Sequence, residues 1–334
     1  MNLIGDHTDY NEGFVLPAAI DLECVVAARR REDAEIALRA LDEVEEGWHR
    51  YPQGVAAALA ERGRPPVGID GALASSVPPG SGLSSSAALE VACALALCDA
   101  AGFELGGTEL ALACQRGEHL ASGVRSGVMD QLAAVAGQAG HALLIDCRSL
   151  EIRPVAVPEE LALLVVHSGL PRRLEQSAYA ERLAACERIA RSLGLRSLRD
   201  AAPADVRDEP LARHVVGENA RVLAAAVALE RGDVSRLGTL FLESHASLRD
   251  DYRVSTPELD VLVDALVAAG AAGARLTGAG FGGCVVAVAE RPRAAGVLDR
   301  AAASYAAATG RTPTVRVCEP SRGASQLGRP SAIP

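Results

Sequence analysis

Residues 78–88 read Pro-Pro-Gly-Ser-Gly-Leu-Ser-Ser-Ser-Ala-Ala and lead directly into an apolar stretch that predicts a helix over 84–101. Gly80 and Gly82 allow the backbone to approach a ligand closely, and a helix start presents free N–H groups with partial positive charge. Together these features can bind phosphate. An ordinary glycine loop with a serine N-cap explains the segment equally well, so both interpretations stay open here. A serine nucleophile is disfavoured because Gly-x-Ser-x-Gly is absent.

The basic residues limit how phosphate can be bound. All 33 are arginine, since the sequence contains no lysine, and this excludes a Walker-type loop. Phosphate must therefore be held by backbone N–H groups, a helix dipole, arginine or a metal ion. The net charge of −10 and the aromatic content of 3% argue against a nucleic-acid partner.

The chain has 334 residues, more than one hydrophobic core usually organises, which predicts two domains. Its 49% hydrophobic and 23% charged residues are typical of a globular protein. Eight cysteines lie scattered without a Cys-x-x-Cys pair, as expected for buried thiols in a reducing compartment. We see no signal peptide and no apolar run of membrane-spanning length, so we expect a cytoplasmic protein without a membrane partner.

Hydrophobic periodicity predicts strands and helices mixed along the chain. The predicted strands are a pair over 13–30 that turns near Pro17, and single strands at 69–74, 141–147, 161–167, 284–290 and 313–318. The predicted helices are 55–62, 84–101, 107–121, 130–137, 175–193, 216–231, 233–248, 257–269 and 293–309. Gly102 is placed to end helix 84–101, which is apolar nearly all round and should be buried. The absence of a regular strand–helix–strand repeat favours the α+β class.

A second glycine cluster, Thr-Gly-Ala-Gly-Phe-Gly-Gly at 277–283, superficially resembles a dinucleotide-binding fingerprint. That fingerprint follows a strand and opens a helix. Here a strand follows instead, so the pattern favours a turn that brings bare backbone against a ligand or a neighbouring loop.

Residues 5–13, Gly-Asp-His-Thr-Asp-Tyr-Asn-Glu-Gly, crowd short polar groups in front of an apolar strand. Carboxylates accept hydrogen bonds and imidazole donates one, which suits a site that binds several hydroxyl groups of a sugar. A metal site formed by Asp6, His7 and Asp9 is a rival interpretation, although adjacent residues rarely converge on one ion. A plain polar turn is the third possibility.

Residues 126–132, Ser-Gly-Val-Met-Asp-Gln-Leu, place Asp130 at the start of a predicted helix. An N-cap role is sufficient to explain this carboxylate. Among apolar neighbours it could also accept a proton from a hydroxyl nucleophile. Glu118 lies on the preceding predicted helix beside His119, where an exposed helical carboxylate is the simplest interpretation.

Taken together, six segments resemble the galactokinase branch of the GHMP small-molecule kinases, in the family's order and over nearly the whole chain. Residues 6–17 resemble its sugar signature, 80–86 its phosphate loop, 126–131 the segment with the catalytic aspartate, and 276–284 its late glycine motif. Residues 213–219 and 243–252 are further galactokinase-like stretches. Any one match could be accidental, but six in order could not plausibly be.

The resemblance implies the roles of matching residues. It implies ATP-dependent phosphorylation of galactose at the C1 hydroxyl, with Asp130 as the base or electrostatic partner of that hydroxyl. Ser86 and Glu118 would hold Mg²⁺ between the ATP phosphates. The residues expected to contact ATP are Gly80, Ser81, Gly82, Leu83, Ser84, Ser85 and Ser86, with Trp48 and Tyr51 near the adenine. Those expected to contact the sugar are Asp6, His7, Thr8, Asp9, Gly127 and Tyr179.

The family fold implied by the resemblance is a two-domain α+β structure with the active site in the cleft between the domains. A ribosomal protein S5 domain 2-like domain would cover 1–155, lacking its first strand, and a ferredoxin-like domain would cover 156–320. Residues 321–334 are rich in Ser, Gly and Pro, and we expect a frayed tail there. We expect a monomer.

This sequence departs from the family at two places. The family usually has glutamate at the position of Asp6, and the shorter side chain could loosen one sugar hydrogen bond or admit a bridging water. The family also has an arginine two residues before the asparagine that matches Asn2, where it steadies the transferring phosphoryl group. That position would precede Met1, so we expect Met1 to be a mis-assigned start, or else an enzyme weakened by roughly 10²–10³-fold or more.

Two alternatives remain besides a galactokinase. One is a kinase for a related sugar, such as N-acetylgalactosamine or arabinose. The other is a catalytically weak sensor of sugar and ATP on the same fold. Regulators of that kind lose the serine–alanine pair after the phosphate loop, whereas Ser86 and Ala87 are present here, which favours an enzyme.

Overall fold

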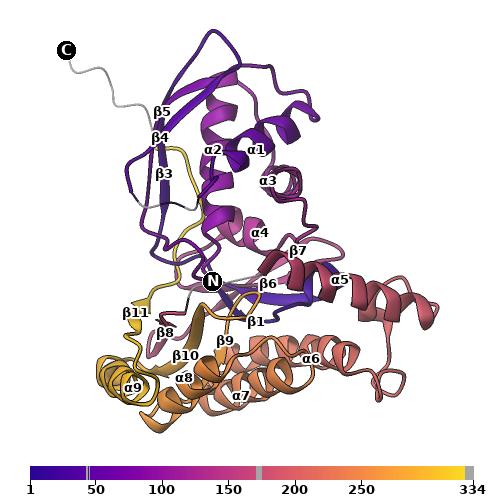
Figure 1. The fold of residues 1–334 in the computed structure, drawn as a ribbon, viewed down its shortest axis with the longest axis vertical. Helices are drawn as coiled ribbons and strands as arrows, with labels where there is room; N and C mark the ends of the chain where they lie inside the picture. Colours follow the sequence, from indigo (N-terminus) through magenta and orange to yellow (C-terminus); the bar gives the residue numbers. More distant parts are fainter. Residues whose placement is uncertain (43, 45, 171–174, 328–334) are drawn as a thin grey trace.

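Three sheets and the helices that cover them make up the part of the chain described by the computed structural model, residues 1–42, 44, 46–170 and 175–327 (Figure 1). The strands are β1 (Asn2–Ile4), β2 (Phe14–Pro17), β3 (Cys24–Arg30), β4 (Ile36–Ala40), β5 (Ile69–Ser75), β6 (His141–Asp146), β7 (Glu151–Ala156), β8 (Leu161–His167), β9 (Gly273–Leu276), β10 (Cys284–Glu290) and β11 (Thr314–Cys318). The helices are α1 (Arg50–Ala60), α2 (Ser85–Ala101), α3 (Gly107–Ser122), α4 (Met129–Ala136), α5 (Glu175–Ser192), α6 (Pro210–Glu230), α7 (Val234–Asp250), α8 (Pro257–Ala268) and α9 (Ala294–Thr309). The predicted α+β class is confirmed.

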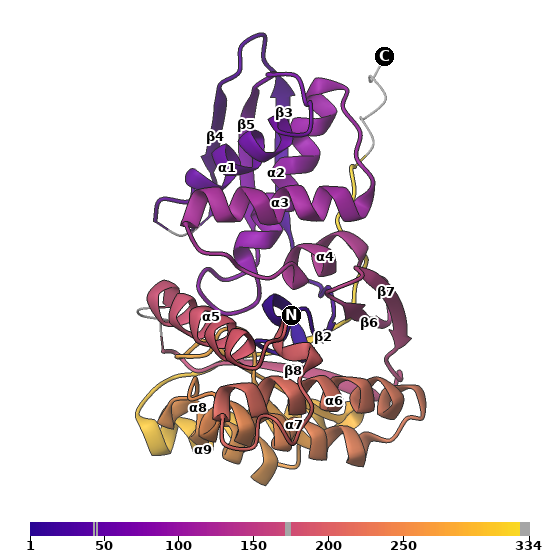
Figure 2. The same ribbon diagram turned by 90° about the vertical axis from the view of Figure 1, so that its right-hand side faces the viewer.

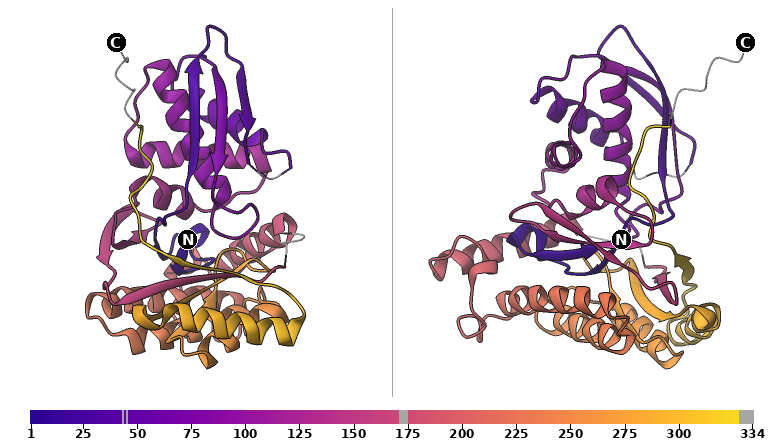
Figure 3. Two further views of the ribbon diagram at one scale, coloured as in Figure 1. Left: turned by 90° about the vertical axis from the view of Figure 1, so that its left-hand side faces the viewer. Right: turned by 180° about the vertical axis from the view of Figure 1, so that it is seen from behind.

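The first half of the chain contains the sheet β3-β5-β4, which is covered on one face by α1 to α4 (Figure 3). Helix α2 lies in the centre of this half and contacts β3, α1, α3 and α4. Its apolar residues therefore find partners on several sides, which explains why α2 has no polar face. The helix ends at Gly102, whose φ of 62° is in the left-handed region. Burial and end point of this helix agree with the prediction.

The second half contains an antiparallel sheet in the order β11-β8-β10-β9. Counted along the chain, its strands lie in the order 4-1-3-2, with α9 between the last two strands, as in a ferredoxin-like fold. The apolar run 161–166 in β8 is buried on both faces. Leu164 and Val166 pack into the core with α8 and α9, while Leu163 and Val165 face the core below the third sheet.

The third sheet, β1-β2-β6-β7, lies between the two halves, and the N-terminus lies beside it (Figures 1 and 2). On one face, Val15 and Ile145 pack against Leu132 of α4. On the other, Leu16 shares a core with Leu163 of β8 and with residues of α6 and α7. One hydrophobic core therefore crosses the expected domain boundary at 155/156.

Several predicted elements need correction. The strands predicted as a pair over 13–30 do not pair, because β2 joins β1 and β6 whereas β3 joins β5. Helices α1 and α6 begin five and six residues earlier than predicted, at Arg50 and Pro210. Strands β1, β4, β7 and β9 were not predicted; each is short or interrupted by charged residues, prolines or glycines, so its apolar pattern is weak.

The predicted tail is ordered at its start. Ser321 and Ala324 donate backbone hydrogen bonds to the carbonyl oxygens of Ala19 and Ala134, so the expected fraying is wrong for these residues. Residues 328–334 lie outside the described residues. All eight cysteines lie within the described residues as thiols outside disulfides, and six of them are buried. Among the described residues, we find no helix long and apolar enough to cross a membrane.

A fully buried cation connects the second half to the start of the chain. Arg275 of β9 donates to Asp6 Oδ2 at 2.5 Å and to the carbonyl oxygen of Leu3 at 3.1 Å. Its Nε also donates to Ser244 Oγ of α7 at 3.1 Å. Arg275 therefore ties β9 and α7 to the turn that follows β1.

Glu218 of α6 holds the same turn from another side. Its Oε1 accepts from the Gly5 N–H at 3.0 Å and lies 3.7 Å from Arg275 Nη2. Burial disfavours the ionised form of Glu218, but Arg221, His214 and Arg275 together lower its pKa to about 2. Burial raises the pKa of Asp6, and Arg275 opposes this rise. The buried cluster thus balances one arginine against two carboxyl groups, with Arg221 at its edge.

We expect Arg275→Met to lower the free energy of unfolding by about 3–5 kcal/mol, because it leaves the buried Asp6 without its cation and removes one of the two arginines beside Glu218. Urea denaturation measures this loss. Arg249→Met is the control, since Arg249 forms an exposed ion pair with Asp250 and should cost about 0–1 kcal/mol. Equal losses in the two variants would contradict the account.

Candidate active site

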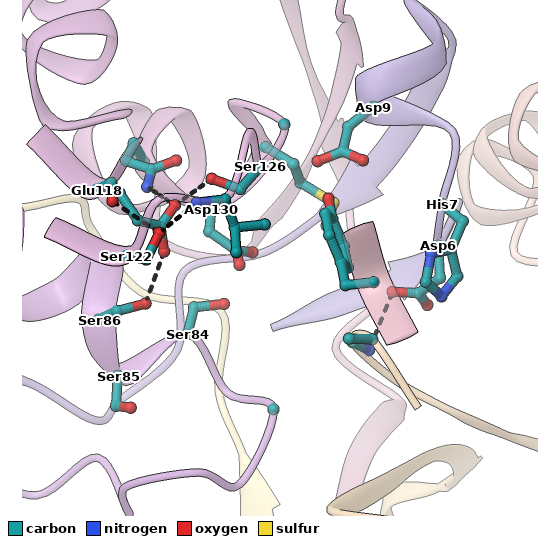
Figure 4. A pocket seen from close by; sticks show the side chains of 18 of the residues that line it. Asp6, His7, Asp9, Ser84, Ser85, Ser86, Glu118, Ser122, Ser126 and Asp130 are labelled. Atoms are coloured by element: carbon teal, nitrogen blue, oxygen red, sulfur yellow. Dashed lines mark hydrogen bonds between the residues drawn. The ribbon is translucent and has the colours of Figure 1, made fainter. Parts of the chain in front are cut away.

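One cavity brings together residues from all four polar segments singled out in the sequence (Figure 4). Ser86, Glu118 and Ser126 lie on one side, Asp6, His7 and Asp9 lie on the other, and Asp130 lies between them. Of the expected site residues, those that line this cavity are Asp6, His7, Asp9, Tyr51, Gly80, Gly82, Ser84, Ser85, Ser86, Glu118, Gly127, Asp130 and Tyr179.

The glycine–serine loop has a backbone shape that suits an anion. Gly80, Gly82 and Ser84 have φ values of 64°, 85° and 65°, so residues in the left-handed region alternate with others along the loop. Such alternation turns successive N–H groups toward one side and makes an anion-binding concavity. Ser84 is the N-cap of α2 by position, but its side chain makes no capping hydrogen bond within the described chain. The predicted serine cap is therefore wrong, and the first N–H groups of α2 are left for another acceptor.

Two residues of this loop turn away from the cavity. Ser81 donates its hydroxyl to the carbonyl oxygen of Pro78 at 2.7 Å and accepts from the Leu83 N–H at 3.3 Å. Leu83 packs into the core beside the third sheet. The side chains of Ser81 and Leu83 therefore support the shape of the loop.

Glu118 is the centre of a polar cluster beside Ser86 and the start of α2. Its carboxylate accepts hydrogen bonds from Ser86 Oγ at 3.2 Å, from Gln131 Nε2 at 3.1 Å and from the Ser126 hydroxyl. Burial raises its pKa, and Asp130 adds to that rise. The interpretation of Glu118 as an exposed helical carboxylate is therefore wrong.

A second carboxyl group, Glu90 of α2, lies fully buried behind this cluster. Gln131 Nε2 donates to Glu90 Oε2 at 2.9 Å and so links Glu90 to Glu118. Burial raises the pKa of Glu90 well above its ordinary value, and the nearby Glu118 adds to the rise. Both effects favour the protonated, neutral form of Glu90.

Asp130 lies in the first turn of α4 and faces the cavity (Figure 4). The N-cap of α4 is Val128, so the predicted N-cap role of Asp130 is wrong. The Asp130 carboxylate therefore lines the same cavity as the start of α2 and the turn at residues 5–13.

Asp9 and Gly127 are in direct contact across the cavity wall. A Cβ atom on Gly127 would lie 1.8 Å from Asp9 Oδ2, so only glycine leaves room for this carboxylate. Burial raises the pKa of Asp9 to about 7, and the charges of Asp130 and Asp6 contribute to the rise. Tyr179 of α5 closes the same end of the cavity.

Asp6, His7 and Thr8 play different structural parts. Asp6 lines the cavity, but its oxygens accept from Arg275 and from the Gly278 N–H at 2.9 Å. His7 faces the cavity with a left-handed backbone at φ 65°. Thr8 is fully buried and donates to the Gly5 and Phe14 carbonyl oxygens, so it holds the turn together and does not line the cavity.

Trp48 and Tyr51 line a second, smaller cavity with Ser85, Ser86 and Leu89. Tyr51, Ser85 and Ser86 line both cavities, which are therefore adjacent. The two cavities meet at the start of α2, and Asp9 does not line the second one.

The glycine segment 277–283 follows the predicted pattern of a turn before a strand, because β9 and β10 flank it and pair with each other. Gly278 and Ala279 line the cavity. Gly280 lies against another loop, where a Cβ atom would be 2.3 Å from the Val254 carbonyl oxygen. The predicted close approach of bare backbone to a neighbouring loop is confirmed, whereas its approach to a ligand stays a prediction.

A protein-only metal site is not supported, since the described residues contain no group of three or more His, Cys, Asp or Glu side chains placed to bind one ion. Ser86 and Glu118 nevertheless fit a magnesium ion. Mg²⁺ is commonly held by one or two carboxylates together with substrate phosphates and water. The Ser86 hydroxyl and the Glu118 carboxylate lie 3.2 Å apart beside the glycine–serine loop, which matches that requirement.

Sequence reasoning missed the residues that hold the site from behind. The sequence analysis gave no role to three residues in or beside the segments it singled out, namely Arg275, Glu218 and Asn219. In the structure, Asn219 accepts a hydrogen bond from the Phe14 N–H at 2.8 Å. An arginine inside the apolar strand 273–276 was a usable signal, because a buried charge needs a partner. Nothing in the sequence indicated that Gln131 links Glu90 to Glu118.

Comparisons with known proteins agree with this geometry. The family model "GHMP kinases N terminal domain" matches residues 50–138, "GHMP kinases C terminal" matches 225–307, and "Galactokinase galactose-binding signature" matches 1–30. The chain is 47% identical to a galactokinase of Roseiflexus sp. (strain RS-1), covering 98% of this chain and 91% of the relative. It is 46% identical to a galactokinase of Chloroflexus aggregans, covering 97% and 91%.

Solved structures also match this chain over nearly its whole length. Lactococcus lactis galactokinase complexed with galactose matches with a TM-score of 0.91 and 32% identity, covering 98% of this chain and 92% of that one. L. major mevalonate kinase in complex with R-mevalonate matches with a TM-score of 0.71 at 23% identity, covering 97% and 94%, which shows the shared fold alone.

We expect Glu90→Gln to weaken the dependence of stability on pH. A carboxyl group with a raised folded pKa contributes stability below its unfolded pKa of about 4.3, and this is lost as pH rises toward the folded pKa. Glutamine has no proton to release. The free energy of unfolding, measured in urea at pH 5 and pH 8, should therefore fall less in Glu90→Gln than in the wild type, by up to about 1.4 kcal/mol per pH unit.

Exposed Glu109→Gln removes one charge without touching the buried cluster and is the matched control. If Glu90→Gln kept the wild-type pH dependence, the raised pKa of Glu90 described here would be contradicted.

Proposed function

This chain belongs to the galactokinase branch of the GHMP kinase family, and we propose that its cavity transfers the γ-phosphoryl group of ATP to the C1 hydroxyl of galactose. The products are galactose 1-phosphate and ADP. The observation that carries the proposal is the position of Asp130, between an anion-binding helix start and a turn rich in carboxylate and imidazole groups.

The nucleotide is assigned to the side of the cavity formed by the loop and α2. The N–H groups of residues 80–86 offer hydrogen bonds to the phosphates, and the helix start adds partial positive charge. This chain needs both because it has no lysine. The adjacent cavity with Trp48 and Tyr51 is assigned to the adenine.

Ser86 and Glu118 are assigned to Mg²⁺, which neutralises charge on the ATP phosphates when it is bound. A cation at this position favours the ionised form of Glu118, whose pKa is raised by burial in the protein alone. Gln131 and Ser126 hold the Glu118 carboxylate in place.

The sugar is assigned to the side of the cavity with Asp9, His7, Gly127 and Tyr179. Asp9 accepts hydrogen bonds from sugar hydroxyls, and Gly127 leaves the space that Asp9 occupies. Asp6 and Thr8 are assigned to holding the turn, since both are engaged with the protein. Aspartate in place of the family's glutamate therefore leaves the anchoring to Arg275 intact.

Asp130 acts on the attacking hydroxyl. The C1 oxygen forms a bond to the γ-phosphorus while the bond from that phosphorus to the leaving ADP oxygen breaks. Asp130 accepts the proton of the hydroxyl or stabilises the charge as the proton departs. Its position at the meeting point of the two sides suits either role.

We expect Asp130→Asn to lower kcat by about 10²–10⁴-fold, because asparagine keeps the shape but accepts no proton. A coupled ATP assay with galactose measures this, and N-acetylgalactosamine and arabinose tested in parallel show whether galactose is the preferred sugar. Exposed Asp299→Asn is the control and should retain wild-type turnover. Undiminished galactose-dependent turnover in Asp130→Asn would contradict the assignment.

We expect Gly127→Ala to lower kcat/KM for galactose by about 10²-fold, since the added methyl group displaces the Asp9 carboxylate. The KM for ATP should change little, because the nucleotide side is untouched. Gly106→Ala is the matched control: its Cβ atom meets nothing closer than 4.0 Å, and its φ of −64° suits alanine. A parallel rise in both KM values would argue against a local effect on the sugar side.

A further inference from the structure

A chain of hydrogen bonds lies directly behind His7. The Tyr10 hydroxyl is 2.9 Å from His7 Nδ1 and 2.6 Å from the Tyr252 hydroxyl. The Tyr252 hydroxyl is in turn 3.2 Å from Cys186 Sγ of α5. Tyr252 and Cys186 are buried. The four side chains come from the turn after β1, from the end of α7 and from α5.

The other ring nitrogen of His7 belongs to the cavity side. Nε2 is buried, and no hydrogen-bond partner of good geometry faces it among the described residues. His7 itself lines the cavity and is only 4% exposed. The ring is also packed against Tyr252, with centroids 4.6 Å apart. A buried, unpaired polar atom beside a cavity indicates that a ligand completes its hydrogen bonding.

Each group in the chain has one hydrogen to donate. Burial raises the pKa values of Tyr10, Tyr252 and Cys186, so all three are protonated. Burial lowers the pKa of His7 to about 3, so its ring is neutral and carries one N–H. If His7 Nδ1 accepts from Tyr10, the single hydrogen on each group requires Tyr252 to donate to Tyr10 and Cys186 to donate to Tyr252.

The chemistry of the groups favours the direction toward His7, because an imidazole nitrogen is a good acceptor for a phenol, whereas a thiol sulfur is a weak one. The opposite direction would leave Tyr252 donating to sulfur.

We propose that Cys186, Tyr252 and Tyr10 form a one-way hydrogen-bond chain that fixes His7 as the Nε2–H tautomer. His7 then donates to a sugar hydroxyl oxygen, while the neighbouring Asp9 accepts from sugar hydroxyls. Tyr10 and Tyr252 are positioning residues for sugar recognition, although neither transfers a group. The proposal rests on the assignment of the sugar to this side of the cavity under the proposed function.

The fixed tautomer has a consequence for specificity. A donor and an acceptor of defined polarity, both buried, reject a sugar whose hydroxyl groups do not match them. A histidine free to exchange tautomers could accept as well as donate, and it would discriminate less between such sugars.

The tautomer is read directly from the ¹⁵N chemical shifts of histidine-labelled protein without ligand, with the His7 signals identified by their loss in His7→Gln. We expect a protonated Nε2 and an unprotonated Nδ1 in the wild type. In Tyr10→Phe, Nδ1 loses its donor, and a mixture of tautomers should appear. A wild-type His7 protonated at Nδ1, or an unchanged tautomer in Tyr10→Phe, would overturn the proposal.

Kinetics provide a second readout. Tyr10→Phe and Tyr252→Phe should each raise the KM for galactose by about three- to tenfold, with kcat changed less than about twofold. Tyr305→Phe is the matched control, because it removes another buried hydroxyl, one that donates to the Ser168 carbonyl oxygen at 2.8 Å. Equal effects in Tyr10→Phe and Tyr305→Phe would mean that the hydroxyls serve only the fold, and would overturn the proposal.

Substrate analogues separate this proposal from the proposed function. Fluorine accepts weakly but does not donate, so at the position that His7 contacts, a monofluoro galactose should be used better than the monodeoxy sugar. That advantage should shrink in Tyr10→Phe; an advantage of unchanged size would contradict the chain. Absence of galactose phosphorylation in the wild type would instead contradict the proposed function, while the tautomer measurement would still decide the hydrogen-bond chain.

Discussion

The buried ion pair between Arg275 and Asp6 is the interaction on which the proposed sugar side of the cavity depends. A charge with no exposed surface cannot lose its partner cheaply, so the turn after β1 is held to β9. Glu218 strengthens this attachment by accepting from the Gly5 N–H. The phosphate side, in contrast, belongs to α2 and its central position in the other half of the molecule. The cavity is therefore formed by two parts of the molecule that different contacts hold in place.

Buried acids set the chemical character of the cavity. Burial raises the pKa values of Asp9, Glu90 and Glu118, and neighbouring carboxyl groups add to each rise. The chain has no lysine that could offset these negative charges. Positive potential must come from backbone N–H groups, a helix start and a divalent cation. This division explains why the loop 80–86 has an alternating backbone, while the polar turn supplies hydrogen-bonding side chains.

Much of this arrangement follows from the sequence. The long helices, the buried α2 and the α+β class were predicted because their apolar patterns are long and regular. Strands β4 and β9 could not be, since each has only four or five residues and depends on its neighbours for pairing. Asp130 and Glu118 were found from their motifs. The sequence did not show that Asp130 leaves α4 uncapped or that Glu118 is buried, because both properties depend on the folded structure. The role of Arg275 required knowing that β9 lies beside the start of the chain.

Amide hydrogen exchange of residues 5–13 in wild type and Arg275→Met tests the central claim most directly, with α3 as the internal reference. The N–H groups of Gly5, Asn11 and Gly13 are hydrogen-bonded in the turn and should exchange slowly in the wild type. We predict that Arg275→Met accelerates exchange in this turn far more than in α3. Equal acceleration in both segments, or unchanged exchange in the turn, would contradict the claim that Arg275 holds the sugar side in place.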